Sequence, residues 1–284
     1  MIKNRISVIF SAFFTFSLLI SCESLPKNTD PNTIIYKDAL NNIHSAPINH
    51  NVPKAQYDKS LFSKKHQIMS YVGDPNYTYR LGADISRHDG DIDWKKVKKS
   101  KLEFIIFRVG YRGYQTGILH VDEKFHQNIK AAMEAGFTDF GVYIFSQAIN
   151  EKEAIEEAEL VLNEIKEYPI NLPVVFDPES ILWEEARTDD ITGEQFTKNT
   201  IAFCEHIKKA GYEPMVYSNL VWETEFFDLS QFSDYKIWYA DYFSVPQTPY
   251  HFEYWQYEGT KLKVPGIKKR IDADIQLISV KDKE

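Results

Sequence analysis

The chain has 284 residues, of which 43% are hydrophobic and 26% charged, and its formal net charge is −8. This length is enough for one large domain or two small ones. The negative charge gives no electrostatic footprint for nucleic acid, so we expect no nucleic-acid partner. Two short basic runs, 93–101 and 266–270, are interpreted as solvated faces of a helix and a loop.

The first 22 residues have the features of an export signal. Lys3 and Arg5 precede fifteen uncharged, mostly apolar residues, which are too few for a membrane span of about 20. The sequence Leu-Ile-Ser-Cys at 19–22 resembles the lipobox of bacterial lipoproteins. This resemblance predicts a signal peptide over 1–22 and a lipid on Cys22. The alternatives are an ordinary secretory signal or an anchor helix that is kept.

The lipobox predicts the location of the protein as well. We expect an exported lipoprotein anchored in a membrane through Cys22. Because the chain contains no repeat of a wall-binding module, a Gram-negative outer membrane is favoured, with the protein facing the periplasm or the cell surface. The second cysteine, Cys204, lies on the apolar side of an expected helix and is interpreted as a small buried hydrophobe rather than a disulfide partner.

Residues 23–78 lack a periodic hydrophobic pattern. They are rich in Asn, Pro, Ser and Thr, which favours a flexible tether between a membrane and a folded domain. A strap or short helix is expected near residues 59–72. We therefore place the folded domain at 79–284.

From residue 80, short apolar segments alternate with amphipathic ones. Helices are expected where apolar residues recur at helical spacing, over 121–136, 150–168 and 192–211. Strands are expected over eight segments: 80–86, 103–110, 139–146, 172–179, 213–219, 236–241, 253–258 and 271–278. Alternating strands and helices predict an α/β fold with a parallel sheet.

Eight strands in about 200 residues favour a closed, TIM-like (β/α) barrel. The barrel is expected to be irregular, because the last third of the chain leaves little room for helices. The alternative is an open doubly wound sheet. That fold usually carries a Gly-rich first turn, and no G-x-G-x-x-G follows a strand here.

Acidic residues stand at several of the expected strand ends. In a barrel of this kind the active site lies at the C-terminal ends of the strands. The sequence places carboxylates near these ends at Asp84, Asp177, Glu179, Asp241, Asp272 and Asp274. We therefore expect a cleft lined by acids at one end of the barrel.

Asp177 and Glu179 form the most informative pair. Side chains alternate along a strand, so these two point to the same side, about 7 Å apart at the backbone. Paired carboxylates serve glycoside cleavage, in which one protonates the leaving oxygen and the other acts at the cationic centre. An Asp-x-Glu at a strand end can also cap a helix, bind a metal or form a salt bridge. Metal binding is disfavoured, because no His stands at a matching spacing.

Four segments in order resemble the glycoside hydrolase family 25 lysozymes, the Chalaropsis-type muramidases. "GADISRHDGDIDW" is similar to the start of that family, and "LPVVFDPE" is similar to its Asp-x-Glu strand. "EYWQYEG" and "VPGI" followed by "IDAD" are similar to its closing segments. The match extends over roughly residues 80 to 279.

The resemblance implies a modified barrel. It implies an enzyme that binds peptidoglycan glycan strands and hydrolyses the β-1,4 bond between N-acetylmuramic acid and N-acetylglucosamine. Separately from the resemblance, we expect a monomer with no cofactor and no metal. By position, Glu179 matches the general acid and Asp177 its partner carboxylate, while Asp84 and Asp272 match further acids of the cleft. Retention through the sugar's own 2-acetamido group and attack by a direct nucleophile both stay open.

Two positions depart from the family pattern. Asp89 stands where the family often has Gln, and Pro178 separates the two acids of the strand. Both changes touch the rim of the cleft and bear on substrate preference more than on reaction type. Candidate residues for binding sugar lie at strand ends or in a matched segment: Arg108, Tyr143, Tyr217, Asp241, Trp255 and Gln256.

Two other functions are considered. The first is a catalytically inactive, glycan-binding lipoprotein, but such a copy commonly loses one of the four acids, and all four are present. The second is another glycosidase on the same barrel, such as a chitinase-like enzyme. Those usually carry a longer D-x-x-D-x-D-x-E run, and Val175 stands where a further acid would be needed.

Overall fold

A computed structural model describes residues 25–182 and 184–283. The expected signal peptide and Cys22 lie outside this part of the chain. Within the described ranges, no helix is both long enough and apolar enough to cross a membrane.

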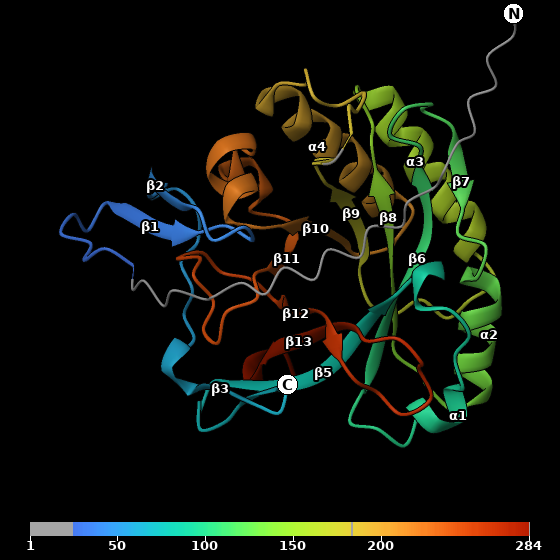
Figure 1. Cartoon of the computed structure of the whole chain (residues 1–284). Coiled ribbons are helices and arrows are strands. Elements are labelled where there is room, and N and C mark those ends of the chain that lie inside the picture. Colours follow the sequence, from blue (N-terminus) through green and yellow to red (C-terminus); the bar gives the residue numbers. More distant parts are fainter. Residues whose placement is uncertain (1–24, 183, 284) are drawn as a thin grey trace, which may run out of the picture.

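The centre of the molecule is a closed barrel of eight strands (Figure 1). All eight segments expected from the sequence form strands of this barrel. Around the barrel they follow the order β5 (Tyr77–Ile85), β6 (Phe104–Arg112), β8 (Phe140–Ser146), β9 (Val174–Pro178), β10 (Pro214–Ser218), β11 (Lys236–Ala240), β12 (Tyr254–Leu262) and β13 (Ile271–Ser279). β13 returns to pair with β5 and closes the barrel.

The strand directions explain why the barrel is irregular. Strands β5 to β12 run parallel around the barrel, whereas β13 runs antiparallel to both of its neighbours. A short strand, β7 (Leu119–Val121), adds to β6 as an antiparallel hairpin. The α/β barrel predicted from the sequence is thus confirmed, and its last strand has the reverse direction.

The helices cover one side of the barrel (Figure 1). They are α1 (Trp94–Val97), α2 (Phe125–Glu134), α3 (Glu151–Ile165) and α4 (Gly193–Lys209), and short helical turns occur at η1 (Lys59–Leu61), η2 (Arg87–Asp89), η3 (Trp222–Phe226), η4 (Leu229–Phe232) and η5 (Val280–Lys283). Side-chain caps start the two long helices: Asn150 accepts from the backbone N–H of Glu153, and Thr192 from that of Gln195. Cys204 is buried on α4.

Apolar side chains alternate between two layers. The inner layer fills the barrel with Phe104, Ile106, Tyr143, Val175, Met215, Tyr217, Trp238, Ala240 and Tyr254. The outer layer packs against the helices and includes Ile105, Phe107, Phe176 and Phe203. Side chains alternate between the two faces of a strand, so every second strand residue points into the barrel interior. Both faces of these strands are buried, and both therefore carry apolar side chains.

Residues 25–76 differ from the flexible tether expected. They form two hairpins, β1 (Thr33–Lys37) with β2 (Ile43–Pro47) and β3 (Phe62–Lys65) with β4 (Ile68–Tyr71). We call this segment the N-terminal strap. It lies along the side of the barrel formed by β11 to β13 and β5, where the chain supplies no long helix (Figure 1).

Aromatic contacts hold the strap to the barrel. The ring of Phe62 lies 5.1 Å from that of Trp255, and the ring of Tyr57 lies 5.0 Å from that of Phe252. The Tyr36 hydroxyl is hydrogen-bonded to Thr224 at 2.8 Å. The strap is folded because it buries the outer faces of β12 and β13, which would otherwise be exposed to water.

Candidate active site

Four acids predicted from the sequence meet at one end of the barrel. Asp84 stands near the end of β5, and Asp177 and Glu179 stand at the end of β9. Asp272 is the second residue of β13, and because β13 runs antiparallel, the start of this strand reaches the same end. The side chains of Asp84 and Asp177 are buried, whereas Glu179 is half-buried. This end of the barrel is therefore the candidate active site.

Glu179 is suited to hold a proton near neutral pH. Burial, followed by repulsion from Asp272, raises the pKa of Glu179 to about 7, although a hydrogen bond from Tyr217 opposes the shift. Burial and the charge of Glu179 also raise the pKa of Asp177, and Arg108 opposes that shift. Two neighbouring buried carboxylates cannot both ionise at low cost. The pair therefore retains a proton at pH values where an exposed carboxyl has lost its own.

The remaining acids form a second group on β5 and β13. Burial is the main cause that raises the pKa of Asp84, with repulsion from Asp272 and Asp274 adding to it. Burial also raises the pKa of Asp272 to about 6, against a hydrogen bond donated by the backbone N–H of Thr260. Asp274 is fully buried, and its Oδ1 accepts a hydrogen bond of 2.9 Å from Trp238 Nε1.

A chain of hydrogen bonds orients Asp84. Gln256 Nε2 donates to Asp84 Oδ2 at 2.8 Å. The other end of the amide, Oε1, accepts from the hydroxyls of Tyr217 at 2.9 Å and Tyr242 at 3.0 Å. The side-chain amide of Gln256 is thus held at both ends. This fixes the face of the Asp84 carboxylate that is open to the cleft.

Arg108 brings a positive charge into this acidic end. It lies on β6 with Ile106 on the inner side, and its Nε donates to Asp122 Oδ2 at 2.8 Å. Nη2 lies 2.7 Å from the same oxygen but makes no hydrogen bond of its own within the described residues. Asp177 Oδ1 is likewise buried without a partner there. Asp177 Oδ1 therefore marks a part of the site that a polar ligand can complete.

The structure separates the predicted sugar-binding residues into two sets. Tyr143 and Tyr217 belong to the inner layer, and Arg108 and Gln256 point to the acids. Asp241 and Trp255 lie on the outside of the barrel and do not join them.

The contacts of Asp241 and Trp255 are structural. Asp241 accepts from the Tyr239 hydroxyl at 2.7 Å and from the backbone N–H of Gln247 at 2.8 Å, so it orders its own loop. Trp255 packs against Phe62 of the strap and donates to the carbonyl of Asp241 at 3.0 Å. These contacts give both residues a structural role, and a substrate contact for either stays a prediction. The outward position of Trp255 follows from strand parity, because the inner neighbour of Trp255 is Gln256.

Three further residues belong to the site. Tyr242 was not predicted, whereas Asp274 was predicted among the carboxylates at strand ends and Asp89 at the rim of the cleft. Tyr242 follows β11, is 41% exposed and touches Gln256. Asp274 lies below Asp84 and Asp272. Asp89 accepts from the backbone N–H of Ser86 at 2.8 Å in a capping box, so its carboxylate holds the turn after β5. Asp274 lies two residues after Asp272 on β13, so the alternation of side chains along a strand predicts that both point to the same side.

The arrangement can perform acid-assisted bond cleavage. A half-buried carboxyl that keeps its proton near pH 7 can protonate a leaving oxygen, and nearby carboxylates can stabilise positive charge. In the described part of the chain, no group of three or more His, Cys, Asp or Glu side chains is arranged to hold a metal ion.

Comparison with known proteins agrees with this chemistry. The sequence profile described as "Glycosyl hydrolases family 25" matches residues 83–267, which is more than half of the chain. A curated relative, the uncharacterized protein YegX of Escherichia coli strain K12, is 23% identical over 198 residues, 68% of each chain.

Solved structures share the fold. The modular autolysin LytC of Streptococcus pneumoniae superposes with a TM-score of 0.59 at 24% identity, over 87% of this chain, and the matched region spans 57% of the length of LytC. A family 25 glycosyl hydrolase of Bacillus anthracis gives 0.56 at 21% identity, covering 69% of this chain and 88% of that one. A muramidase of Trichobolus zukalii gives 0.56 at 19% identity, covering 72% and 96%.

Proposed function

Because the chain belongs to the glycosyl hydrolases of family 25, and is thus a glycoside hydrolase, we propose that it degrades peptidoglycan by cleaving the β-1,4 bond between N-acetylmuramic acid and N-acetylglucosamine. The names of the similar structures support this substrate: one is a muramidase, and LytC was solved with a synthetic peptidoglycan ligand. The observation that carries the proposal is the half-buried Glu179, with a pKa of about 7, beside Asp177 at the barrel mouth.

In this proposal Glu179 is the general acid. It donates its proton to the glycosidic oxygen as the bond to the anomeric carbon breaks. Asp177 is the negative group beside the anomeric centre, where positive charge develops. It acts on that charge directly or by orienting the 2-acetamido group of the sugar. Asp84 and Asp272 shape the electrostatics of the cleft, since the charge of Asp272 raises the pKa of Glu179.

The test is a digestion with product analysis. Purified peptidoglycan is incubated with the chain from Glu23 onward, which retains both strap and barrel, and in parallel with Glu179→Gln. Products are reduced with borohydride, and the new reducing ends are identified by mass spectrometry. Muramitol ends that form with wild type but not with Glu179→Gln are the expected result.

Two other results have distinct meanings. Glucosaminitol ends would keep the assignment of the protein as a glycosidase but would show that a different bond of the glycan is cleaved. Binding of the glycan without cleavage by wild type would favour the inactive, glycan-binding alternative and contradict the enzymatic proposal.

We also propose that the protein is exported and anchored in a membrane by a lipid on Cys22, with a Gram-negative outer membrane as its location. The pattern of the first 22 residues supports this. Expression in a bacterial host with radiolabelled palmitate should label the wild-type protein and not Cys22→Ser. Equal labelling of both proteins, or none, would contradict the proposal.

A further inference from the structure

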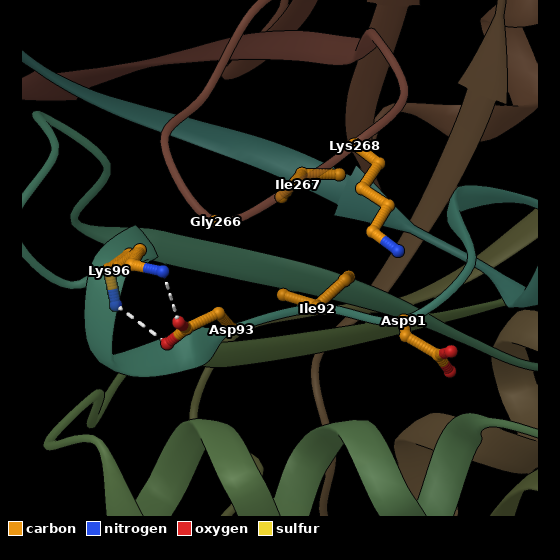
Figure 2. Close-up of a pocket in the computed structure, with 7 residues that line it drawn as sticks. All are labelled: Asp91, Ile92, Asp93, Lys96, Gly266, Ile267 and Lys268. Atoms are coloured by element: carbon orange, nitrogen blue, oxygen red, sulfur yellow. Dashed lines mark hydrogen bonds and ion pairs between the residues drawn. The ribbon is translucent and has the colours of Figure 1, made fainter.

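A surface hollow lies beside the barrel mouth, outside the acid cluster (Figure 2). Its lining residues are Asp91, Ile92, Asp93, Lys96, Gly266, Ile267 and Lys268. We call it the basic hollow. One wall is the segment 91–101, which includes α1, and the other is the segment 261–270, which connects β12 to β13.

The two walls are joined by backbone contacts. The N–H of Asp93 donates to the carbonyl of Gly266 at 2.8 Å, and Ile92 bridges Ile267. Gly266 has a φ of +98°, and a Cβ there would lie 2.5 Å from the carbonyl oxygen of Asp93. This close approach requires glycine. The two walls are therefore fixed relative to each other.

The fold thereby brings together two basic runs from distant parts of the sequence. Segment 91–101 holds five lysines and two aspartates, a net charge of +3, and segment 261–270 holds four lysines, one arginine and no acid, a net charge of +5. Together they carry +8 in a chain whose formal net charge is −8, so the rest of the molecule carries −16. The hollow thus lies between two basic segments, whereas its own lining of two lysines and two aspartates is balanced in charge.

The acids of the hollow are already neutralised. Asp93 forms an ion pair of 2.9 Å with Lys96, and Asp91 pairs with Lys124. Lys268 is exposed and forms no ion pair with the described residues. In Figure 2 Lys96 and Lys268 stand on opposite walls of the hollow. Among the lining residues, the positive charge of Lys268 is therefore the one available to an anion from solution.

Both walls are continuous with the active site. Segment 261–270 ends directly before β13, and Lys268 precedes Asp272 by four residues, so their backbones are at most about 13 Å apart. The other wall begins after the η2 turn that follows Asp84 and β5. Lys269 Nζ donates to the carbonyl of His88 in that turn at 2.6 Å. A polymer bound in the cleft would thus pass close to the hollow.

We propose that the basic hollow binds the carboxylates of the stem peptides carried by the glycan strand in the cleft. The inference rests on the proposed function, which makes peptidoglycan the substrate. Each stem peptide carries free carboxylates, and a few extended residues span about 10–17 Å, which covers the distance from the cleft to the hollow. Exposed lysines act as screened point charges, so the contribution should be modest and sensitive to salt.

The test compares two substrates and two matched variants. The substrates are soluble glycan strands with their stem peptides and the same strands stripped by an amidase. Lys96→Gln combined with Lys268→Glu removes three positive units from the hollow. Lys130→Gln combined with Lys166→Glu makes the same change at exposed sites on the helical side of the barrel. Thermal unfolding confirms that each variant folds, and Lys268→Gln alone serves as a milder version.

The hollow variant should raise KM about tenfold on intact strands at low salt, with kcat unchanged. The increase should disappear on stripped strands, which lack the ligand, and should not occur in the control variant, which keeps the lysines of the hollow. It should also disappear in 0.5 M NaCl, where a Debye length of roughly 4 Å screens the charges. An unchanged KM on intact strands, or an equal increase on stripped strands, would contradict the proposal. A hollow variant that no longer binds phosphatidylglycerol vesicles but keeps the KM of wild type would also contradict the proposal. Absence of cleavage by wild type on either substrate would instead contradict the proposed function.

Discussion

Asp272 and Asp84 lie at the same level on paired strands, although Asp272 begins its strand and Asp84 ends its own. The register places Asp274 opposite Gly82 on antiparallel strands, so two residues further along Asp272 faces Asp84. In a fully parallel barrel, the start of the last strand would lie at the opposite end from the active site. The reversal of β13 is thus the feature that completes the acid cluster, and it lets Asp272 raise the pKa of Glu179.

The first prediction concerns the pH dependence of activity. Glu179 must be protonated to act as general acid, and its pKa is about 7. We therefore expect kcat/KM on peptidoglycan to fall as the pH rises through about 7. Glu179→Gln should lower kcat by about 10²- to 10⁴-fold and remove this alkaline limb. A wild-type profile that stays flat up to pH 9 would contradict the assignment of Glu179.

The second prediction concerns stability. The pKa of Glu179 in the folded protein, about 7, is above the usual value of 4.5, so folding favours its protonated form. That contribution is present at low pH and is lost as the pH rises from about 4.5 through about 7. Glu179→Gln carries no ionisable group. We expect it to be more stable than wild type by about 3 kcal/mol at pH 8 and equally stable at pH 4.

Thermal unfolding at the two pH values measures this difference. For a chain of this size, about 3 kcal/mol corresponds to a rise in Tm of roughly 6–12 °C at pH 8. Leu182→Ala, which shortens an exposed side chain in the same loop, is the control and should show no pH-dependent difference. A variant less stable than wild type at pH 8 would show that Glu179 is not a destabilising buried charge.

Much of the barrel could be predicted from the sequence, because its signals are local. Eight apolar strands and three amphipathic helices each follow from periodicity over their own residues, and Asp177 and Glu179 follow from their place at a strand end. The direction of β13 is set by a long-range pairing with β5, which no local pattern encodes. The sequence therefore predicts that Asp272 belongs to the site, but it does not explain why the residue lies there.

The strap and two of the candidate residues show a different limit. Tyr57 and Phe62 are isolated aromatics in a polar segment, and their burial depends on the outer face of β12. That partner lies about 190 residues away in the sequence. Trp255 and Gln256, in contrast, could have been separated from sequence alone. They are adjacent on one strand, so only one of them can face the barrel interior.

The third prediction concerns Arg108. Its charge opposes the rise in the pKa of Asp177, so its removal should raise that pKa further and move the acid limb of kcat/KM to higher pH. Arg108→Gln alone would leave Asp122 buried and unpaired, at a cost of about 3–5 kcal/mol. The variant to test is therefore Arg108→Gln combined with Asp122→Asn, which removes both charges.

Arg108→Lys is the matched control, because it keeps the positive charge and loses the forked geometry. We expect its acid limb to stay near that of wild type, while the double variant shifts toward neutral pH. An unshifted acid limb in a folded double variant would show that Arg108 serves the structure and does not tune Asp177. A reduced kcat/KM with no change in the shape of the profile would support that structural role.

The fourth prediction is that the strap is part of the folded unit. Phe62 is 6% exposed, and its ring lies 4.7 Å from that of Tyr71 and 5.1 Å from that of Trp255. Phe62→Ala should lower the free energy of unfolding by about 3–5 kcal/mol, through lost burial and the cavity that remains. Val72→Ala, in the same segment but 68% exposed, should change it by less than about 0.5 kcal/mol.

Urea unfolding followed by tryptophan fluorescence measures both variants, since Trp255 lies under the strap. A chain that starts at Tyr77 tests the same point more strongly. It would expose the outer aromatic faces of β12, so we expect it to aggregate or to unfold at much lower urea concentrations. If this shortened chain unfolds at the same midpoint as the full one, the strap is only a covering layer, and the barrel is stable without it.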